Sequence, residues 1–267
     1  MSFTNILQKI IAQKQVEVTA AKTAVPVKVL EQTIAQQPAA ISLKASIDNA
    51  ENGIGIISEF KRKSPSKGII NNLADCTDTV TGYAKAGAAG ISILTDEQFF
   101  MGHIDDIIKA RPYVHTPILR KDFTIDEYQV FEARAIGASA ILLIAACLTA
   151  QQVKDFTRLA HQLNLEVLLE LHTEEELDHF YDDIDLVGIN NRNLKNFEVD
   201  LEHSIKLAEK LPAHKTKIAE SGLSKVENVL YLKQQGFNGF LMGEHFMRAE
   251  NPATALANFV KEIKDKL

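Results

Sequence analysis

The sequence predicts an α/β protein built as a single (β/α)8 TIM barrel with an N-terminal helical extension. Short β-branched runs alternate with segments of helical periodicity, which is typical of a parallel sheet. Eight such units follow one another, and 267 residues is close to the usual length of about 250 residues for one closed barrel. No linker-like stretch divides the chain, so we expect one barrel domain over residues 1–267.

The expected strands are continuous apolar runs, as in a sheet that is buried on both faces. In chain order they are IGIISEF, AGISILT, TPILRK, ASAILLIA, LEVLLEL, LVGIN, KIAES and GFLMG, beginning near residues 54, 89, 116, 138, 165, 186, 217 and 239. Helical segments such as LTAQQVKDFTRLAHQL and LSKVENVLYLKQQG lie between them. In the second of these, we expect Ser224 as the N-cap and Gly236 as the C-terminal stop.

Residues 1–50 precede the first strand, and their first part, TNILQKIIAQKQVEVTAAK, has apolar residues at helical spacing. We expect residues 1–50 to form a helical extension that packs on the barrel, over one of its ends. Charged residues interrupt the apolar positions of this segment, so it does not resemble a signal peptide.

The composition limits the possible partners and compartments. A net charge of -6 and a pI near 5.8 argue against nucleic acids and membrane surfaces, because both favour a basic face. Cys76 and Cys147 lie far apart in the sequence, and we expect two buried thiols rather than a disulfide. The apolar run around Cys147 is shorter than the about 20 residues of a membrane-spanning helix. We therefore expect a cytoplasmic protein.

Polar residues follow almost every expected strand, at the end where barrel enzymes carry their working residues. Side chains two residues apart on a strand share a face, so Glu59 and Lys61 point the same way. Lysines and carboxylates that meet at one end of a barrel can shift one another's pKa values. The residues that should converge there are Glu59, Lys61, Lys121, Glu170, Asn190, Arg192 and Glu220.

A phosphate site is expected at the last two strands, which end in AESGLS and FLMGEHFM. The loops after strands seven and eight form the recurrent phosphate site of these barrels. Small residues matter there because they let backbone N–H groups approach phosphate oxygens. The segment SEFKRKSPSKG, at the end of the first strand, adds a local positive field that would attract an anionic substrate.

The whole chain resembles the indole-3-glycerol-phosphate synthase family. The resemblance is carried, in order, by SEFKRKSPSKG, SILTDEQFF, LRKDFTIDEYQV, AILLIAACL, LLELHTEEEL, VGINNRNL, IAESGL and GFLMGEHFMR. It implies a carboxy-lyase of tryptophan biosynthesis that converts 1-(2-carboxyphenylamino)-1-deoxyribulose 5-phosphate to indole-3-glycerol phosphate, carbon dioxide and water. It further implies an anionic sugar-phosphate substrate, no metal and no organic cofactor, and it is compatible with weak association with other tryptophan-pathway enzymes.

The resemblance also implies roles for the residues of the reacting centre. Lys121 would be the general acid for ring closure, and Glu170 would transfer protons, chiefly in the dehydration. Lys61 would pair with the substrate carboxylate, and Glu59 would orient its ammonium group and keep it charged. Asn190 would contact the substrate hydroxyls.

The remaining positions would bind the substrate. Glu220 would contact the substrate hydroxyls together with Asn190. Arg192 would fix its own loop and nearby carboxylates rather than perform chemistry. Phe100, Phe123 and Leu142 would cover the anthranilate ring, with plain core packing as the alternative for each.

The phosphate would rest on Ser64, Ser221, Gly222, Gly243 and the amide of Glu244. The residue after Gly243, here Glu244, is often Ser in the family. An inward carboxylate would repel phosphate, so we expect Glu244 to point away from it.

Two other functions stay open from the residues alone. A metal-dependent barrel lyase or epimerase would use Glu170, His172 and Glu220 as ligands, although Lys61 and Lys121 would oppose the cation. A barrel that binds phosphate without catalysis would serve as a ligand sensor or assembly partner. Such a binder has no need for acid and proton-transfer residues together, which favours the enzyme.

Overall fold

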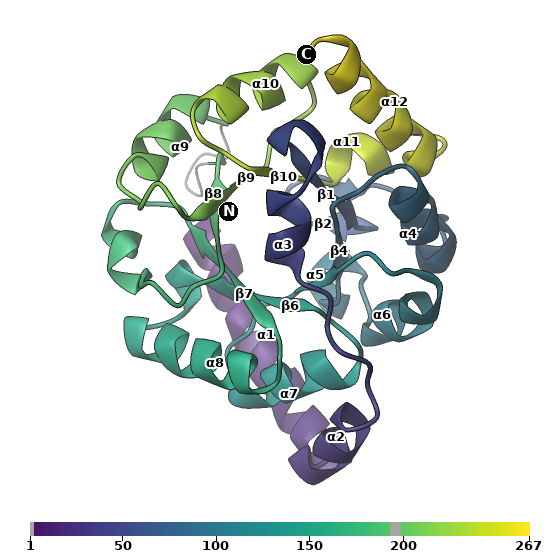
Figure 1. Ribbon diagram of the computed structural model, residues 1–267. Coiled ribbons are helices and arrows are strands. Elements are labelled where there is room, and N and C mark those ends of the chain that lie inside the picture. The colour runs from purple at the N-terminus through teal and green to yellow at the C-terminus, as the bar shows by residue number, and fades with distance from the viewer. Residues whose placement is uncertain (1–2, 193–198) are drawn as a thin grey trace.

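The protein is described here from a computed structural model, which covers residues 3–192 and 199–267. In this part of the chain, eight parallel strands close into a barrel in the order β1-β10-β9-β8-β7-β6-β5-β4 (Figure 1). Each expected strand is present, which confirms the barrel. The strands are β1 (Gly55–Phe60), β4 (Gly90–Leu94), β5 (Ile118–Lys121), β6 (Ala140–Ile144), β7 (Glu166–Leu171), β8 (Leu186–Asn190), β9 (Thr216–Glu220) and β10 (Gly239–Met242).

Helices connect the strands and surround the barrel (Figure 1). The expected N-cap of α10 is wrong by one residue, because Lys225 holds that position and no side chain caps the helix. Gly236, with φ +87°, ends the helix as expected. The helices are α4 (Cys76–Lys85), α5 (Glu97–Phe100), α6 (Ile104–Ala110), α7 (Glu127–Ala135), α8 (Ala150–Gln162), α9 (Leu201–Ala208), α10 (Val226–Gln234), α11 (Glu244–Met247) and α12 (Pro252–Asp265).

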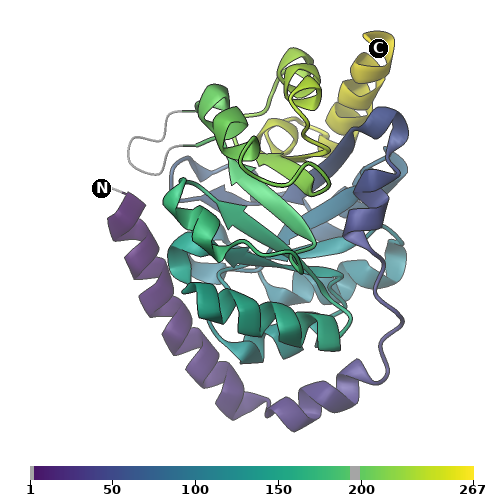
Figure 2. The same ribbon diagram turned by 60° about the vertical axis from the view of Figure 1, so that its left-hand side comes forward.

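The N-terminal extension covers both ends of the barrel rather than one. It consists of α1 (Phe3–Ala24), α2 (Val27–Ile34) and α3 (Leu43–Asp48), and Figure 2 shows α1 and α3 on opposite sides of the barrel. Leu43 and Ile47 of α3 are fully buried and close the N-terminal end of the barrel. On the other side, Lys14 of α1 lies 3.1 Å from Asp96 and 2.9 Å from Asp122, which follow β4 and β5.

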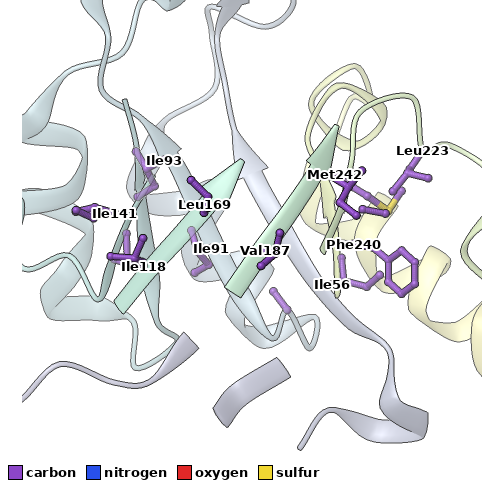
Figure 3. Packing of buried hydrophobic residues seen from close by; sticks show 14 of the residues in the cluster. Ile56, Ile91, Ile93, Ile118, Ile141, Leu169, Val187, Leu223, Phe240 and Met242 are labelled. Atoms are coloured by element: carbon purple, nitrogen blue, oxygen red, sulfur yellow. The ribbon is translucent and has the colours of Figure 1, made fainter. Parts of the chain in front are cut away.

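Two large apolar clusters form the core of the barrel, and a third packs α1 and α2 against α7. The larger lies between the strands and the surrounding helices, and Figure 3 shows members such as Ile91, Leu169 and Phe240. The smaller fills the inside of the barrel, where aliphatic side chains of the strands meet α3. The strands are therefore apolar on both faces, as their continuous runs predict.

The loop after β1 carries a short antiparallel pair, β2 (Lys63–Ser64) and β3 (Gly68–Ile69). Arg62 anchors the base of this loop, because its two guanidinium nitrogens donate to the Asp106 carboxylate at 2.6 and 2.8 Å. The charge of Arg62 therefore has a structural role.

Both cysteines are free thiols, but only Cys76 is buried, while Cys147 is half-buried. The expectation of two buried thiols is therefore right for the first and wrong for the second. Within the described residues, no helix has the length and apolar character needed to cross a membrane.

Candidate active site

A cavity of about 580 Å³ opens at the C-terminal ends of the strands. Every residue that the sequence places at the site lines this cavity. They are Glu59, Lys61, Ser64, Phe100, Lys121, Phe123, Leu142, Glu170, Asn190, Arg192, Glu220, Ser221, Gly222, Gly243 and Glu244. The structure thus brings them together, while their chemical roles stay predictions.

The charged part of the site is one layer of the barrel interior. Glu59, Lys121, Glu170 and Glu220 come from β1, β5, β7 and β9, which alternate around the barrel. Two residues earlier, the same strands contribute the buried aliphatic layer of Ile57, Leu119, Leu168 and Ile218. Alternation along each strand therefore places one lysine and three carboxylates directly above an apolar floor.

Lys121 lies between two carboxylates. Its Nζ is 3.6 Å from Glu170 Oε2 and 3.6 Å from Glu220 Oε2. Burial opposes its charge, but the carboxylates of Glu170, Glu220 and Glu59 outweigh burial and raise the pKa of Lys121 above its usual value. Lys121 is therefore protonated at neutral pH and can act as an acid.

The two carboxylates beside Lys121 have opposite pKa shifts. Burial favours neutral Glu170, but the Lys121 charge and hydrogen bonds from His172 and Asn190 outweigh it and lower the pKa of Glu170. Burial, and then the charge of Glu170, raise the pKa of Glu220. Its Oε1 has no hydrogen-bond partner among the described residues. The two carboxyl groups that share the lysine thus differ in how readily they ionise, an arrangement suited to separate acid and base roles.

Gly188 makes room for the Glu220 carboxyl group. A Cβ atom at this position would lie 2.1 Å from Glu220 Oε1. Because β8 pairs with β9, only a residue without a side chain lets the Glu220 carboxyl group turn toward this strand.

His172 is a site residue whose role was not found from the sequence, where it was considered only as a metal ligand. Its Nε2 is 2.9 Å from Glu170 Oε1, and its Nδ1 is 3.5 Å from Glu176 Oε2. Burial opposes the charge of His172, but hydrogen bonding to both glutamates raises its pKa to about 9. The sequence does carry a signal for this role: His172 lies two residues after Glu170, and this spacing places both side chains on one face of the strand.

Polar contacts fix the other side chains of this layer. Lys61 pairs with Glu59, as the resemblance implies. Asn190 donates to Glu170 Oε1 at 3.0 Å and accepts from the amide of Arg192 at 3.0 Å. Within the described part of the chain, no group of three or more His, Cys, Asp or Glu side chains is arranged to hold a metal ion.

One wall of the cavity is apolar. The rings of Phe100 and Phe123 lie with centroids 6.0 Å apart, and Leu142 lines the wall while also belonging to the barrel interior. The extension completes the wall with side chains of α1 that the sequence places on the barrel but not in the site. These are Ile6, Leu7 and Ile10.

The opposite end of the cavity carries the expected phosphate-binding residues. Ser221 and Gly222 have φ of 68° and 70°, a left-handed pair that turns the chain after β9. A Cβ atom at Gly222 would lie 2.5 Å from Val199, so glycine is required there. Ser64 is almost fully buried.

Glu244 differs from the expectation that its carboxylate points away from this end. The carboxylate lies 3.0 Å from Arg248 Nε, and 4.0 Å each from Lys67 Nζ and Arg192 Nη2. All four residues line the cavity. The carboxylate thus lies among basic side chains that line the cavity, rather than away from them.

Known proteins were compared with the chain in sequence and in structure. A family model described as indole-3-glycerol phosphate synthase matches residues 7–259. The indole-3-glycerol phosphate synthase of Bacteroides thetaiotaomicron is 47% identical over 260 residues, covering 97% of this chain and 99% of the relative. The enzyme of the same name from Polaromonas naphthalenivorans is 42% identical over 264 residues, covering 97% and 100%.

Solved structures agree with the fold. A mutant tryptophan synthase α-subunit from Pyrococcus furiosus superposes with a TM-score of 0.56 at 16% identity, covering 80% of this chain and 98% of that one. This likeness shows the barrel alone. The full-length sequence relatives and the family model go further, and by them the chain belongs to the indole-3-glycerol phosphate synthase family.

Proposed function

We propose that this protein is an indole-3-glycerol phosphate synthase, a carboxy-lyase that forms the indole ring in tryptophan biosynthesis. Its substrate is 1-(2-carboxyphenylamino)-1-deoxyribulose 5-phosphate, and its products are indole-3-glycerol phosphate, carbon dioxide and water. The position of Lys121 carries the proposal, because this buried ammonium group lies 3.6 Å from both Glu170 and Glu220. The surrounding cavity joins an apolar wall to a phosphate end, as this substrate requires.

Ring closure needs an acid at the substrate ketone. The ring carbon that bears the carboxylate attacks the ketone carbon, and Lys121 donates a proton to the ketone oxygen as the new bond forms. Lys61 holds the carboxylate, which leaves as carbon dioxide while the electron pair of its bond returns to the ring. Glu59 contacts Lys61 and keeps its ammonium group in place.

Dehydration needs a base as well as an acid. The hydroxyl group made from the ketone oxygen leaves as water with the proton that Glu170 takes from carbon, and Lys121 regains its own proton from solvent. Glu170, which is ionised, takes the carbon-bound proton that completes the indole double bond. Asn190 holds Glu170 through a 3.0 Å hydrogen bond, and the raised pKa of Glu220 lets its protonated form donate to a substrate hydroxyl.

The two ends of the cavity orient the substrate. The apolar wall of Phe100, Phe123 and Leu142 fits the flat anthranilate ring. Ser64 and the backbone around Gly222 and Gly243 fit the phosphate, since neither glycine carries a side chain that would block the approach.

We place the protein in the cytoplasm, where free thiols such as those of Cys76 and Cys147 are stable. We further propose that residues 1–267 form one domain, with residues 1–50 as its extension. The chemistry above uses side chains alone and requires neither a metal nor an organic cofactor. Weak association with other tryptophan-pathway enzymes stays a prediction.

The test is a fluorescence time course with the substrate and excess chelator. Indole fluorescence should grow with the native protein and fall by about 10²- to 10⁴-fold in rate with Lys121→Ala. Lys109→Ala is the matched control, because its side chain on α6 is 70% exposed. Substrate binding without product in the native protein would support a ligand sensor and overturn the proposal, and chelator-sensitive turnover would overturn its cofactor-free chemistry.

A further inference from the structure

The Glu244 carboxylate is surrounded by three basic side chains at the phosphate end of the cavity. Arg248 Nε lies at 3.0 Å, and Arg192 Nη2 and Lys67 Nζ each lie at 4.0 Å. Arg248 follows α11, Arg192 follows β8, and Lys67 lies in the turn between β2 and β3. One carboxylate therefore connects the loop after the first strand to the segments that follow β8 and α11.

The contacts of Glu244 with Lys67 and Arg192 are loose. Charge-assisted hydrogen bonds are about 2.7–2.9 Å long, and both distances exceed this range. Arg192 also donates to Ser66 Oγ at 3.1 Å, while its buried Nε has no hydrogen-bond partner among the described residues. Both cations thus keep donors that an anion with better geometry can use.

The charge balance of this cluster fits a phosphate group. Three cations and one carboxylate leave two positive charges, and a phosphate monoester carries a charge of about -1.5 to -2 at pH 7. A phosphate also offers three acceptor oxygens, whereas the Glu244 carboxylate offers two and already spends one on Arg248. A bound phosphate therefore brings the cluster from about +2 to near neutrality, and Lys67 and Arg192 can turn from the carboxylate to the phosphate.

We propose that Glu244 sets the affinity of the phosphate site by competing with the substrate phosphate for Lys67 and Arg192. On binding, these two cations turn from the carboxylate to the phosphate, and Arg248 retains the carboxylate. Glu244 thereby weakens phosphate binding and speeds the release of the phosphorylated product. This inference rests on the proposed function, because it requires a phosphate at this end of the cavity.

The test is calorimetric titration of the full-length protein with inorganic phosphate. Glu244→Gln removes the charge and keeps a group that can bond Arg248. A unit charge on the order of 8 Å from a dianion changes its affinity by roughly fivefold in a water-like medium, so the Kd for phosphate should fall roughly fivefold at low salt. At about 1 M salt, where charges are screened beyond about 3 Å, the gain should be less than twofold.

Two further variants separate competition from other effects. Glu250→Gln removes an exposed carboxylate from the same part of the chain and should leave the Kd unchanged. Lys67→Met should raise the Kd more in the Glu244→Gln background than in the native one, because in the native protein the gain from the contact of Lys67 with phosphate is partly offset by the loss of its contact with Glu244.

An equal or higher Kd in Glu244→Gln would overturn the inference and leave the proposed function intact. The same holds if Lys67→Met has equal effects in both backgrounds. If the native protein bound no phosphate at all, the phosphate site of the proposed function would fail, and the inference with it.

Discussion

The narrow space beside Glu220 makes Gly188→Ala a sharp test of the active-site geometry. The new methyl carbon would lie 2.1 Å from Glu220 Oε1 and 3.4 Å from Leu168 Cδ1. The carboxyl group must then move by more than 1 Å to reach an ordinary contact of about 3.4 Å, and it can do so because it ends a flexible side chain. That movement disturbs the 3.6 Å contact of Glu220 with Lys121.

A misplacement of about 1 Å at a reacting centre can cost about 10²-fold in rate, and we expect that loss in kcat/KM for Gly188→Ala. Stability should change by only about 1 kcal/mol, since a side-chain end rather than the backbone must move. Product fluorescence measures the first quantity, and unfolding in denaturant measures the second.

Gly87→Ala is the converse control. Gly87 has φ +92° with no atom within 4 Å of an added Cβ, so the substitution strains the backbone without touching the site. It should lower stability by about 1–2 kcal/mol and leave kcat/KM unchanged. The steric reasoning would be refuted if Gly188→Ala kept kcat/KM within threefold of the native value. It would also be refuted if the loss of activity only matched the fraction of the variant that is unfolded.

Three other perturbations probe the network around the site. Pairing raises the folded-state pKa of His172 to about 9, so the stability it contributes is fully present below its unfolded pKa of about 6.5 and is lost as pH rises through about 9. In denaturant unfolding at several pH values, His172→Gln should flatten this loss of stability. An unaltered loss in the variant would contradict the argument. Lys14→Met leaves two buried aspartates without their lysine and should lower the free energy of unfolding by about 3–5 kcal/mol in denaturant. The control Lys44→Met, at an exposed pair, should lower it by under about 1 kcal/mol. Equal losses in the two variants would refute the argument. Phe123→Ala removes one ring of the apolar wall and should raise KM by about tenfold or more in the fluorescence assay, and an unchanged KM would place the anthranilate ring elsewhere.

The barrel and the charged layer were accessible from the sequence because both follow from periodicity. Continuous apolar runs mark the strands, and the residue at the end of each run points inward when the residue two places earlier does. Glu170 above Leu168 and Glu220 above Ile218 obey this rule. The same rule covers His172, whose role was missed because only metal ligation was considered for it.

Features that depend on tertiary packing were not accessible. Helical spacing places α1 on the barrel, but nothing local shows that Ile10 lines the cavity or that Lys14 reaches Asp122, 108 positions away by number. The pair of β2 and β3 is too short for a periodic pattern. The approach of the Glu244 carboxylate to Lys67 and Arg192 was not accessible either, because the fold brings these two residues from distant segments.

The most direct measurement of the central claim is a crystal structure with a substrate analogue whose ketone is reduced to an alcohol. We predict that Lys121 Nζ lies within hydrogen-bond distance of this hydroxyl, with the aromatic ring between Phe100 and Phe123 and the phosphate on the amides near Gly222 and Gly243. An analogue bound with its hydroxyl away from Lys121, or with its phosphate at the apolar wall, would contradict the account.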